Sequence, residues 1–107
     1  MVDPLLPRHE SFRVHTKRNR DTALVQPSGE LDLASVTTLR EELGRAANRG
    51  ARSIVLDLSG LDFMDGAGIG AILASQRSAR LNGESFRFAG ATGQVAWLLE
   101  LCGLSSA

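Results

Sequence analysis

The 107-residue chain has little of what several classes of protein site require. It contains one cysteine, Cys102, and two histidines, so no internal disulfide can form and no zinc-ligand spacing is present. The histidines are His9, in the first ten residues, and His15, on a predicted edge strand. Neither is placed to form a Ser-His-Asp triad with Ser59. We therefore expect a protein that is not an enzyme and that carries no metal and no cofactor.

The chain also lacks a net charge and long apolar runs. Twelve basic and twelve acidic residues cancel, and direct nucleic-acid binding normally needs a basic patch. No apolar run approaches the ~18 residues of a membrane-spanning helix. The first residues lack the pattern of a signal peptide, and the lone cysteine suits a reducing compartment. We expect a cytoplasmic protein without membrane insertion.

The length is that of one domain. Residues 1–10 contain two prolines and no periodicity, which predicts a flexible N-terminal tail before a single domain over 11–107. Alternating or continuous apolar residues predict strands at 11–17, 22–26, 53–58 and 85–89. Helical spacing predicts three helices, with N-caps at Ser35, Asp65 and Thr92. The order indicates an α/β fold with a mostly parallel four-stranded sheet, to which the N-terminal strand adds antiparallel.

Several side chains are assigned to the core by the same patterns. The unbroken Ile54-Val55-Leu56 predicts a strand buried on both faces. Leu73 falls on the predicted core side of the second helix and Cys102 on that of the third. Trp97 is expected to be partly buried, with an exposed partner contact as the alternative. Pro27 cannot donate to a ladder, so the second strand should bend or lose pairing there.

The stretch from Asp57 to Gly70 organises the chain as a strand, a tight acidic loop and a glycine-rich helix start. Its carboxylates could gather with Asp32 at the strand ends and hold Mg²⁺, but turn formation, capping and solvation are the more common explanation of such a cluster. The glycines raise nucleotide binding as an alternative, but neither phosphate-loop nor dinucleotide motif is present. Close helix packing is the simpler interpretation.

The motifs Gly29-Glu-Leu-Asp32 and Val55-Leu-Asp-Leu-Ser-Gly-Leu-Asp-Phe-Met-Asp-Gly-Ala-Gly-Ile-Gly70, with Cys102-Gly-Leu104, resemble the STAS domain of anti-sigma factor antagonists. The resemblance implies a partner, an anti-sigma factor with a kinase-like fold, whose capture frees a sigma factor to regulate transcription. In that family the kinase phosphorylates a serine at the start of the central helix, and the complex then dissociates.

Two positions depart from the family pattern Phe-Met-Asp-Ser-Ser/Thr-Gly. Ala67 stands at the phosphoacceptor position and Gly66 replaces the serine before it, so phosphorylation there is ruled out. The resemblance implies a partner surface that includes Asp32, Ser59, Asp65, Gly66, Ala67, Gly68, Gly70, Ala71, Ala74 and Arg77.

Two further implications concern assembly. Family members usually continue with a further strand and helix that are absent here, which would leave a face open to self-association as a homodimer. A STAS subunit of a lipid-transport or stress-signalling assembly is the alternative function, and slow nucleotide hydrolysis is a third hypothesis.

Overall fold

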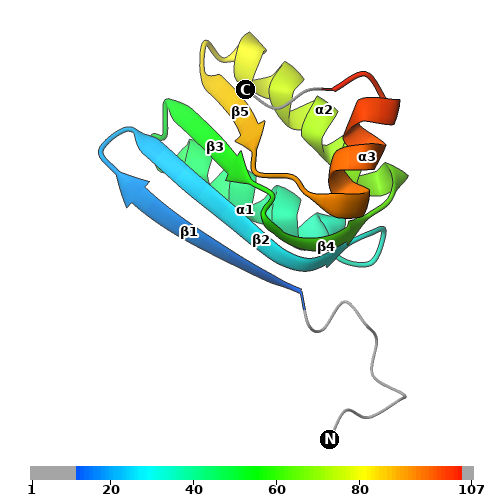
Figure 1. Ribbon diagram of the computed structural model, residues 1–107. Coiled ribbons are helices and arrows are strands. Elements are labelled where there is room, and N and C mark those ends of the chain that lie inside the picture. Colours follow the sequence, from blue (N-terminus) through cyan, green and yellow to red (C-terminus); the bar gives the residue numbers. More distant parts are fainter. Residues whose placement is uncertain (1–11, 105–107) are drawn as a thin grey trace, which may run out of the picture.

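The fold is an α/β domain, seen in a computed structural model that describes residues 12–104. The predicted tail over residues 1–10 lies outside this range. Along the chain the elements are β1 (Arg13–Asn19), β2 (Thr22–Leu31), α1 (Val36–Asn48), β3 (Ser53–Asp57), β4 (Gly60–Met64), α2 (Gly66–Leu81), β5 (Ser85–Ala89) and α3 (Gly93–Leu101). The predicted order is confirmed except for β4, because the acidic stretch expected to be a loop forms a fifth strand (Figure 1).

The sheet has the order β1-β2-β3-β5, with β4 paired to β2. β1 and β2 form the predicted antiparallel hairpin, and Arg20 closes its turn with a positive φ of 56°. β2 pairs in parallel with β3 and β3 with β5. The mostly parallel sheet with an antiparallel first strand is therefore confirmed, with five strands in place of four.

β2 pairs with two other strands in succession along the same edge. Its residues 22–25 pair with β3 and its residues 28–31 pair with β4. Pro27 falls in the gap between the two parallel ladders, where its missing N–H removes no bond from either. The parallel pairing is interrupted at Pro27 as predicted, but the strand itself continues to Leu31.

The carboxylate of Asp57 fixes the junction at which β3 gives way to β4. Its Oδ2 accepts from the Gln26 amide (3.1 Å) and its Oδ1 from the Ser59 N–H (3.0 Å). Gly90 has a φ of 81°, and a Cβ there would come within 2.8 Å of Asp57 Oδ1. The Gln26 amide, followed by the N–H and hydroxyl of Ser59, holds the pKa of Asp57 below its ordinary value.

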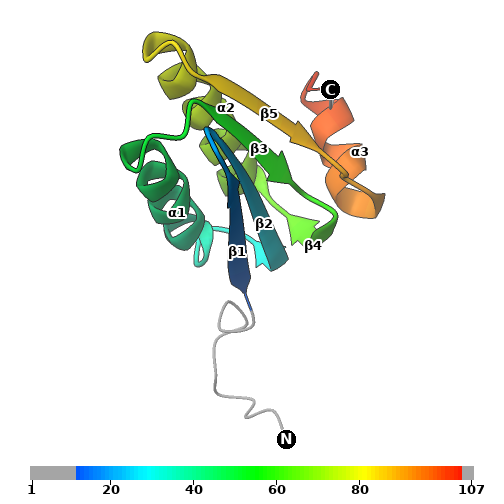
Figure 2. The same cartoon turned by 90° about the vertical axis from the view of Figure 1, so that its left-hand side faces the viewer.

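α1 and α2 cover one face of the sheet (Figures 1 and 2). On that face Ala23, Ile54 and Phe86 lie in register, followed one step along by Val25, Leu56 and Phe88. The opposite face carries the row Leu24, Val55 and Arg87, of which Val55 is only half-buried. The expectation that β3 is buried on both faces was therefore wrong, because the two crossover helices lie on the same side.

The capping residues predicted for the helix ends are confirmed only in part. Gly50 and Gly83 adopt the left-handed conformation after α1 and α2, as expected of C-terminal stops. Asp65 caps α2 with its side chain, whereas Ser35 and Thr92 occupy N-cap positions without a side-chain capping bond. No helix between residues 12 and 104 is both long and apolar enough to cross a bilayer.

Three core assignments need correction. Leu73 is 41% exposed and Trp97 58% exposed, and Cys102 is exposed at the C-cap of α3. In α2 the buried side chains are Ile69, Ala71, Ile72 and Ala79, so the helix is rotated enough to turn Leu73 outward. In α3 the helix ends at Leu101, and the chain leaves the buried stripe before Cys102.

Gln94 of α3 completes the outer edge of β4. Its Nε2 donates to the Met64 carbonyl oxygen (2.8 Å), and its Oε1 accepts from the Met64 N–H (3.0 Å). Both Met64 groups lie on the side of β4 away from β2, and the amide side chain bonds them as a neighbouring strand would. This pair of bonds joins α3 to the strand that leads into α2.

The Gln94 bridge predicts a clear stability effect. Gln94→Ala should lower the free energy of unfolding by about 1–3 kcal/mol, because it leaves two backbone groups of Met64 without partners. Urea unfolding followed by circular dichroism measures the change. Gln76→Ala, which shortens a half-exposed glutamine of α2, is the matched control, and an equal effect of both variants would contradict the role of the bridge.

Asp57 predicts a pH dependence of stability. Its pKa in the folded state lies below that in the unfolded state, so its charge stabilises the fold above the unfolded-state value near ~4. This stabilisation is lost as the pH falls through the folded-state pKa. The difference in unfolding free energy between wild type and Asp57→Asn should be about 1–2 kcal/mol at neutral pH and should shrink in acid.

Urea unfolding between neutral pH and pH ~3 tests this dependence. Asp62→Asn removes an exposed carboxylate of the adjoining strand and is the matched control for the lost charge. A constant difference between wild type and Asp57→Asn across the whole range would show that the charge of Asp57 does not stabilise the fold.

Candidate functional site

The candidate site lies where β2 and β4 end side by side. Leu31 and Met64 are paired at the end of the ladder, and the Asp65 N–H donates to the Leu31 carbonyl oxygen (3.2 Å). The 32–35 loop and the start of α2 therefore leave the sheet from adjacent points. The two predicted partner segments form one continuous surface.

The 32–35 loop is held by Asp32 and Ser35. Asp32 Oδ1 accepts from the N–H groups of Ala34 (3.0 Å) and Ser35 (3.1 Å). The Ser35 hydroxyl donates to the Glu30 carbonyl oxygen (2.7 Å) and accepts from the Asp32 N–H (3.0 Å). Because Ser35 is only 1% exposed, these bonds fix the loop against the body of the protein.

The start of α2 is organised by Asp65. Its Oδ1 accepts from the Ala67 N–H (2.9 Å), and its carbonyl oxygen accepts from the N–H groups of Gly68 and Ile69. Three of the first four N–H groups of α2 are thus bonded within the chain. This leaves few donors for a phosphate and weighs against the nucleotide hypothesis.

Gly66 and Ala67 differ in what surrounds them. Gly66 is exposed, and a Cβ there would meet nothing within 4 Å. Ala67 is half-buried and packs against the core at the edge of the surface. Its methyl group is the only side-chain atom at this position.

Gly68 is buried and serves packing. A Cβ on Gly68 would approach Met64 Sδ to 2.8 Å and Leu31 Cδ2 to 3.1 Å, and both side chains are fully buried. The absence of a side chain lets α2 begin directly against the ends of β2 and β4. This confirms close packing as one reason for the glycines.

The structure does not bring all the predicted carboxylates together. β4, a five-residue strand of roughly 16 Å, separates Asp57 and Ser59 from Asp65. No three histidine, cysteine, aspartate or glutamate side chains group as a metal site within residues 12–104. The expected gathering of Asp32, Asp57, Asp62 and Asp65 therefore does not occur, because an unpredicted strand carries the chain onward.

The remaining predicted residues spread along α2. Gly70 is half-buried, and Ala74 and Arg77 are exposed, so they extend the surface along the helix. Arg77 lies eleven residues beyond Gly66, a distance of about 16 Å. Ala71 is fully buried and offers no contact to a partner.

Two apolar residues beside the site were missed by the sequence reasoning. Leu33, at the tip of the 32–35 loop, is 79% exposed, and Phe63, at the end of β4, is 38% exposed. Exposed apolar side chains of this size mark interaction surfaces when they gather. The available signal was the position of Leu33, an apolar residue between a turn-forming aspartate and a helix cap.

Substitutions of the glycines separate packing from conformational effects. Gly68→Ala should destabilise the fold by about 1–3 kcal/mol through overpacking against Met64 and Leu31. Gly70→Ala, in the same helix, meets nothing within 4 Å and should be neutral or stabilising by up to about 1 kcal/mol. Thermal and urea unfolding of the two variants test the contrast, and equal effects would contradict it.

Comparison with known proteins gives the family. Residues 13–107 match the STAS domain. The anti-sigma-B factor antagonist of Staphylococcus aureus is 29% identical over 80 residues, which cover 75% of this chain and 74% of that protein. The anti-sigma-B factor antagonist of Bacillus subtilis is 27% identical over 94 residues, covering 88% and 85%.

A solved structure agrees with these relatives. The unphosphorylated form of the anti-sigma factor antagonist SpoIIAA superimposes with a TM-score of 0.73 at 26% identity, over 87% of this chain and 81% of that one. The family match covers nearly the whole described domain, including the strand, loop and helix that build the candidate site. The chain therefore belongs to the STAS domain family.

Proposed function

We propose that this protein is an anti-sigma factor antagonist: it binds an anti-sigma factor with a kinase-like fold and so frees a sigma factor to regulate transcription. It acts by binding and not by catalysis, in the cytoplasm. The observation that carries the proposal is the continuous surface formed by the 32–35 loop and the start of α2, in a chain similar to known antagonists.

The proposed surface is rigid and partly apolar, as a docking site requires. Asp32 and Ser35 hold the loop, and Asp65 holds the helix start. Leu33 and Phe63 supply exposed apolar area beside the exposed Gly66. A surface that is ordered before binding loses less conformational entropy when a partner docks.

We further propose that binding is not switched by phosphorylation at Ala67. A phosphoserine would add about −1.5 to −2 charges at pH 7, and an unpaired charge buried in an interface costs several kcal/mol. Ala67 has no hydroxyl group to accept a phosphate. The surface therefore stays uncharged at this position and remains competent for binding.

Binding to a purified anti-sigma factor of the same organism tests the proposal. Ala67→Asp and Gly66→Glu each place a carboxylate at the start of α2 and should raise the dissociation constant at least about tenfold, or about 1.4 kcal/mol. Gly66→Glu is the cleaner variant, because its site is open and a carboxylate in the first helical turn favours the helix. Isothermal titration calorimetry measures both.

Ser85→Asp is the matched control. It adds the same charge at an exposed position at the start of β5, the opposite end of the parallel strands from the site, and should leave binding unchanged. Equal binding by all variants would overturn the assignment of this surface. No binding by the wild type to any anti-sigma factor of the organism would overturn the function itself and favour the transport or stress-signalling assembly.

A further inference from the structure

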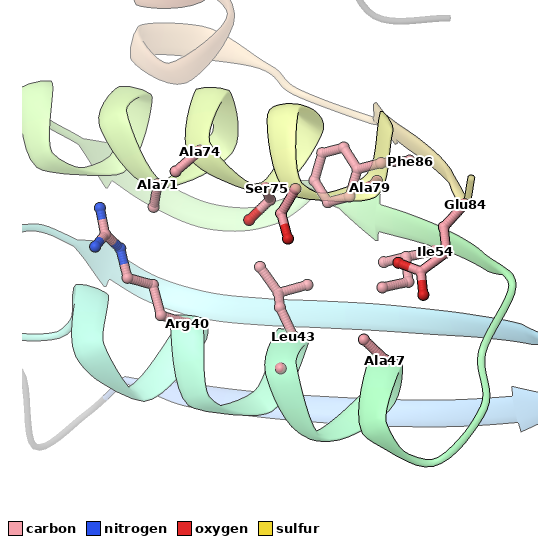
Figure 3. A pocket seen from close by; sticks show the side chains of 12 residues that line it. Arg40, Leu43, Ala47, Ile54, Ala71, Ala74, Ser75, Ala79, Glu84 and Phe86 are labelled. Carbon is pink, nitrogen blue, oxygen red and sulfur yellow. The ribbon is translucent and has the colours of Figure 1, made fainter. Parts of the chain in front are cut away.

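A groove of about 200 Å³ runs between α1 and α2, away from the start of α2 (Figure 3). Ile54 and Phe86, adjacent residues of β3 and β5, lie at its floor. Its walls are mostly small side chains, contributed by Gly44 and Ala47 of α1 and by Ala71, Ala74, Ser75, Ser78 and Ala79 of α2.

The groove exists because neither helix fills the space between them. A Cβ at Gly44 would meet nothing within 4 Å, and the facing residues of α2 are no larger than serine. The volume exceeds the ~150 Å³ that holds a benzene molecule in an engineered protein cavity. It is enough for a large apolar side chain from outside the domain.

The two ends of the groove carry opposite charges. Arg40 lies at the end near Ala71, and Glu84 lies at the other end, near Ala47 and Ile54 (Figure 3). Within residues 12–104 no hydrogen bond or ion pair engages the side chain of either residue. An occupant that complements the groove therefore carries an acidic group and a basic group at matching positions.

We propose that the occupant is a second copy of this chain, docked across the groove by a two-fold axis. Such an axis reverses the direction of the groove, so Arg40 of each copy meets Glu84 of the other, and both pairs form together. This arrangement uses the same patch on both subunits, as two-fold dimers do. No other protein is needed to supply the complementary charges.

Leu81 supplies the apolar side chain that this interface needs. It is 80% exposed and lies three and seven residues after Ser78 and Ala74, on the same side of α2. In the two-fold arrangement the two α2 helices run antiparallel, and the small side chains of the rim let them approach closely. The net charge of zero adds no long-range repulsion between the copies.

The proposed dimer interface and the proposed partner surface overlap at Ala74 and otherwise lie on different parts of α2. Ala74 belongs to the rim of the groove, whereas Gly66 and Ala67 lie outside it. The start of α2 and the 32–35 loop stay accessible in the dimer. Dimerisation therefore leaves free the part of the proposed partner surface that precedes Ala74.

Charge reversal tests this interface. Sedimentation equilibrium of the full chain over a hundredfold range of concentration should show a monomer–dimer equilibrium. Arg40→Glu or Glu84→Arg alone places like charges together twice and should raise the dimer dissociation constant about tenfold or more. The double variant restores both pairs with reversed sign and should return the constant close to that of wild type.

Two further variants complete the test. Leu81→Ser should weaken the dimer without changing any charge, and Glu41→Arg, at an exposed position of α1 outside the groove, should leave it unchanged. Circular dichroism confirms that each variant is folded. A wild type that stays monomeric throughout, or a double variant no more dimeric than the single variants, would overturn the proposal.

Discussion

The pairing of β2 with two successive strands is the constraint on which the rest of the structure depends. β3 leaves its edge at the Asp57 junction, and β4 takes over for the last residues of β2. Because β4 runs parallel to β2 and ends beside it, α2 must begin next to the 32–35 loop. The Asp57–Gln26 bond, the Gly90 conformation and the position of Pro27 all serve this exchange of partners.

The start of α2 and its later turns have different roles. Its start carries the residues of the proposed partner surface, and its later turns form one wall of the groove against α1. Glycine has a different use in each region. At Gly68 it permits contact with the buried Met64 and Leu31, whereas at Gly44 it leaves space unfilled. One helix of this domain can thus contribute to both of the proposed interaction surfaces.

Much of the fold could be predicted from the sequence, because local patterns determined it. The bounds of α2 and its Asp65 cap follow from apolar spacing and a capping residue. β4 could not be found this way, because Gly60 and Asp62 are typical of turns, and its strand structure depends on pairing with β2 and on Gln94. Because β4 was not predicted, the sequence placed the four aspartate carboxylates closer together than they lie in the structure. The exposure of Leu73 and Cys102 depends on helix rotation and end position, which spacing alone does not determine.

The bridge from Gln94 to Met64 also has a consequence for biogenesis. The outer backbone groups of Met64 in β4 are bonded by Gln94 of α3, which lies about thirty residues further along the chain. A nascent chain that has emerged from the ribosome only as far as α2 holds both Met64 backbone groups unsatisfied. The strand that leads into the proposed partner surface is therefore completed only after α3 has been synthesised and has docked. A chain interrupted before α3 would present this surface on a strand whose outer edge is open.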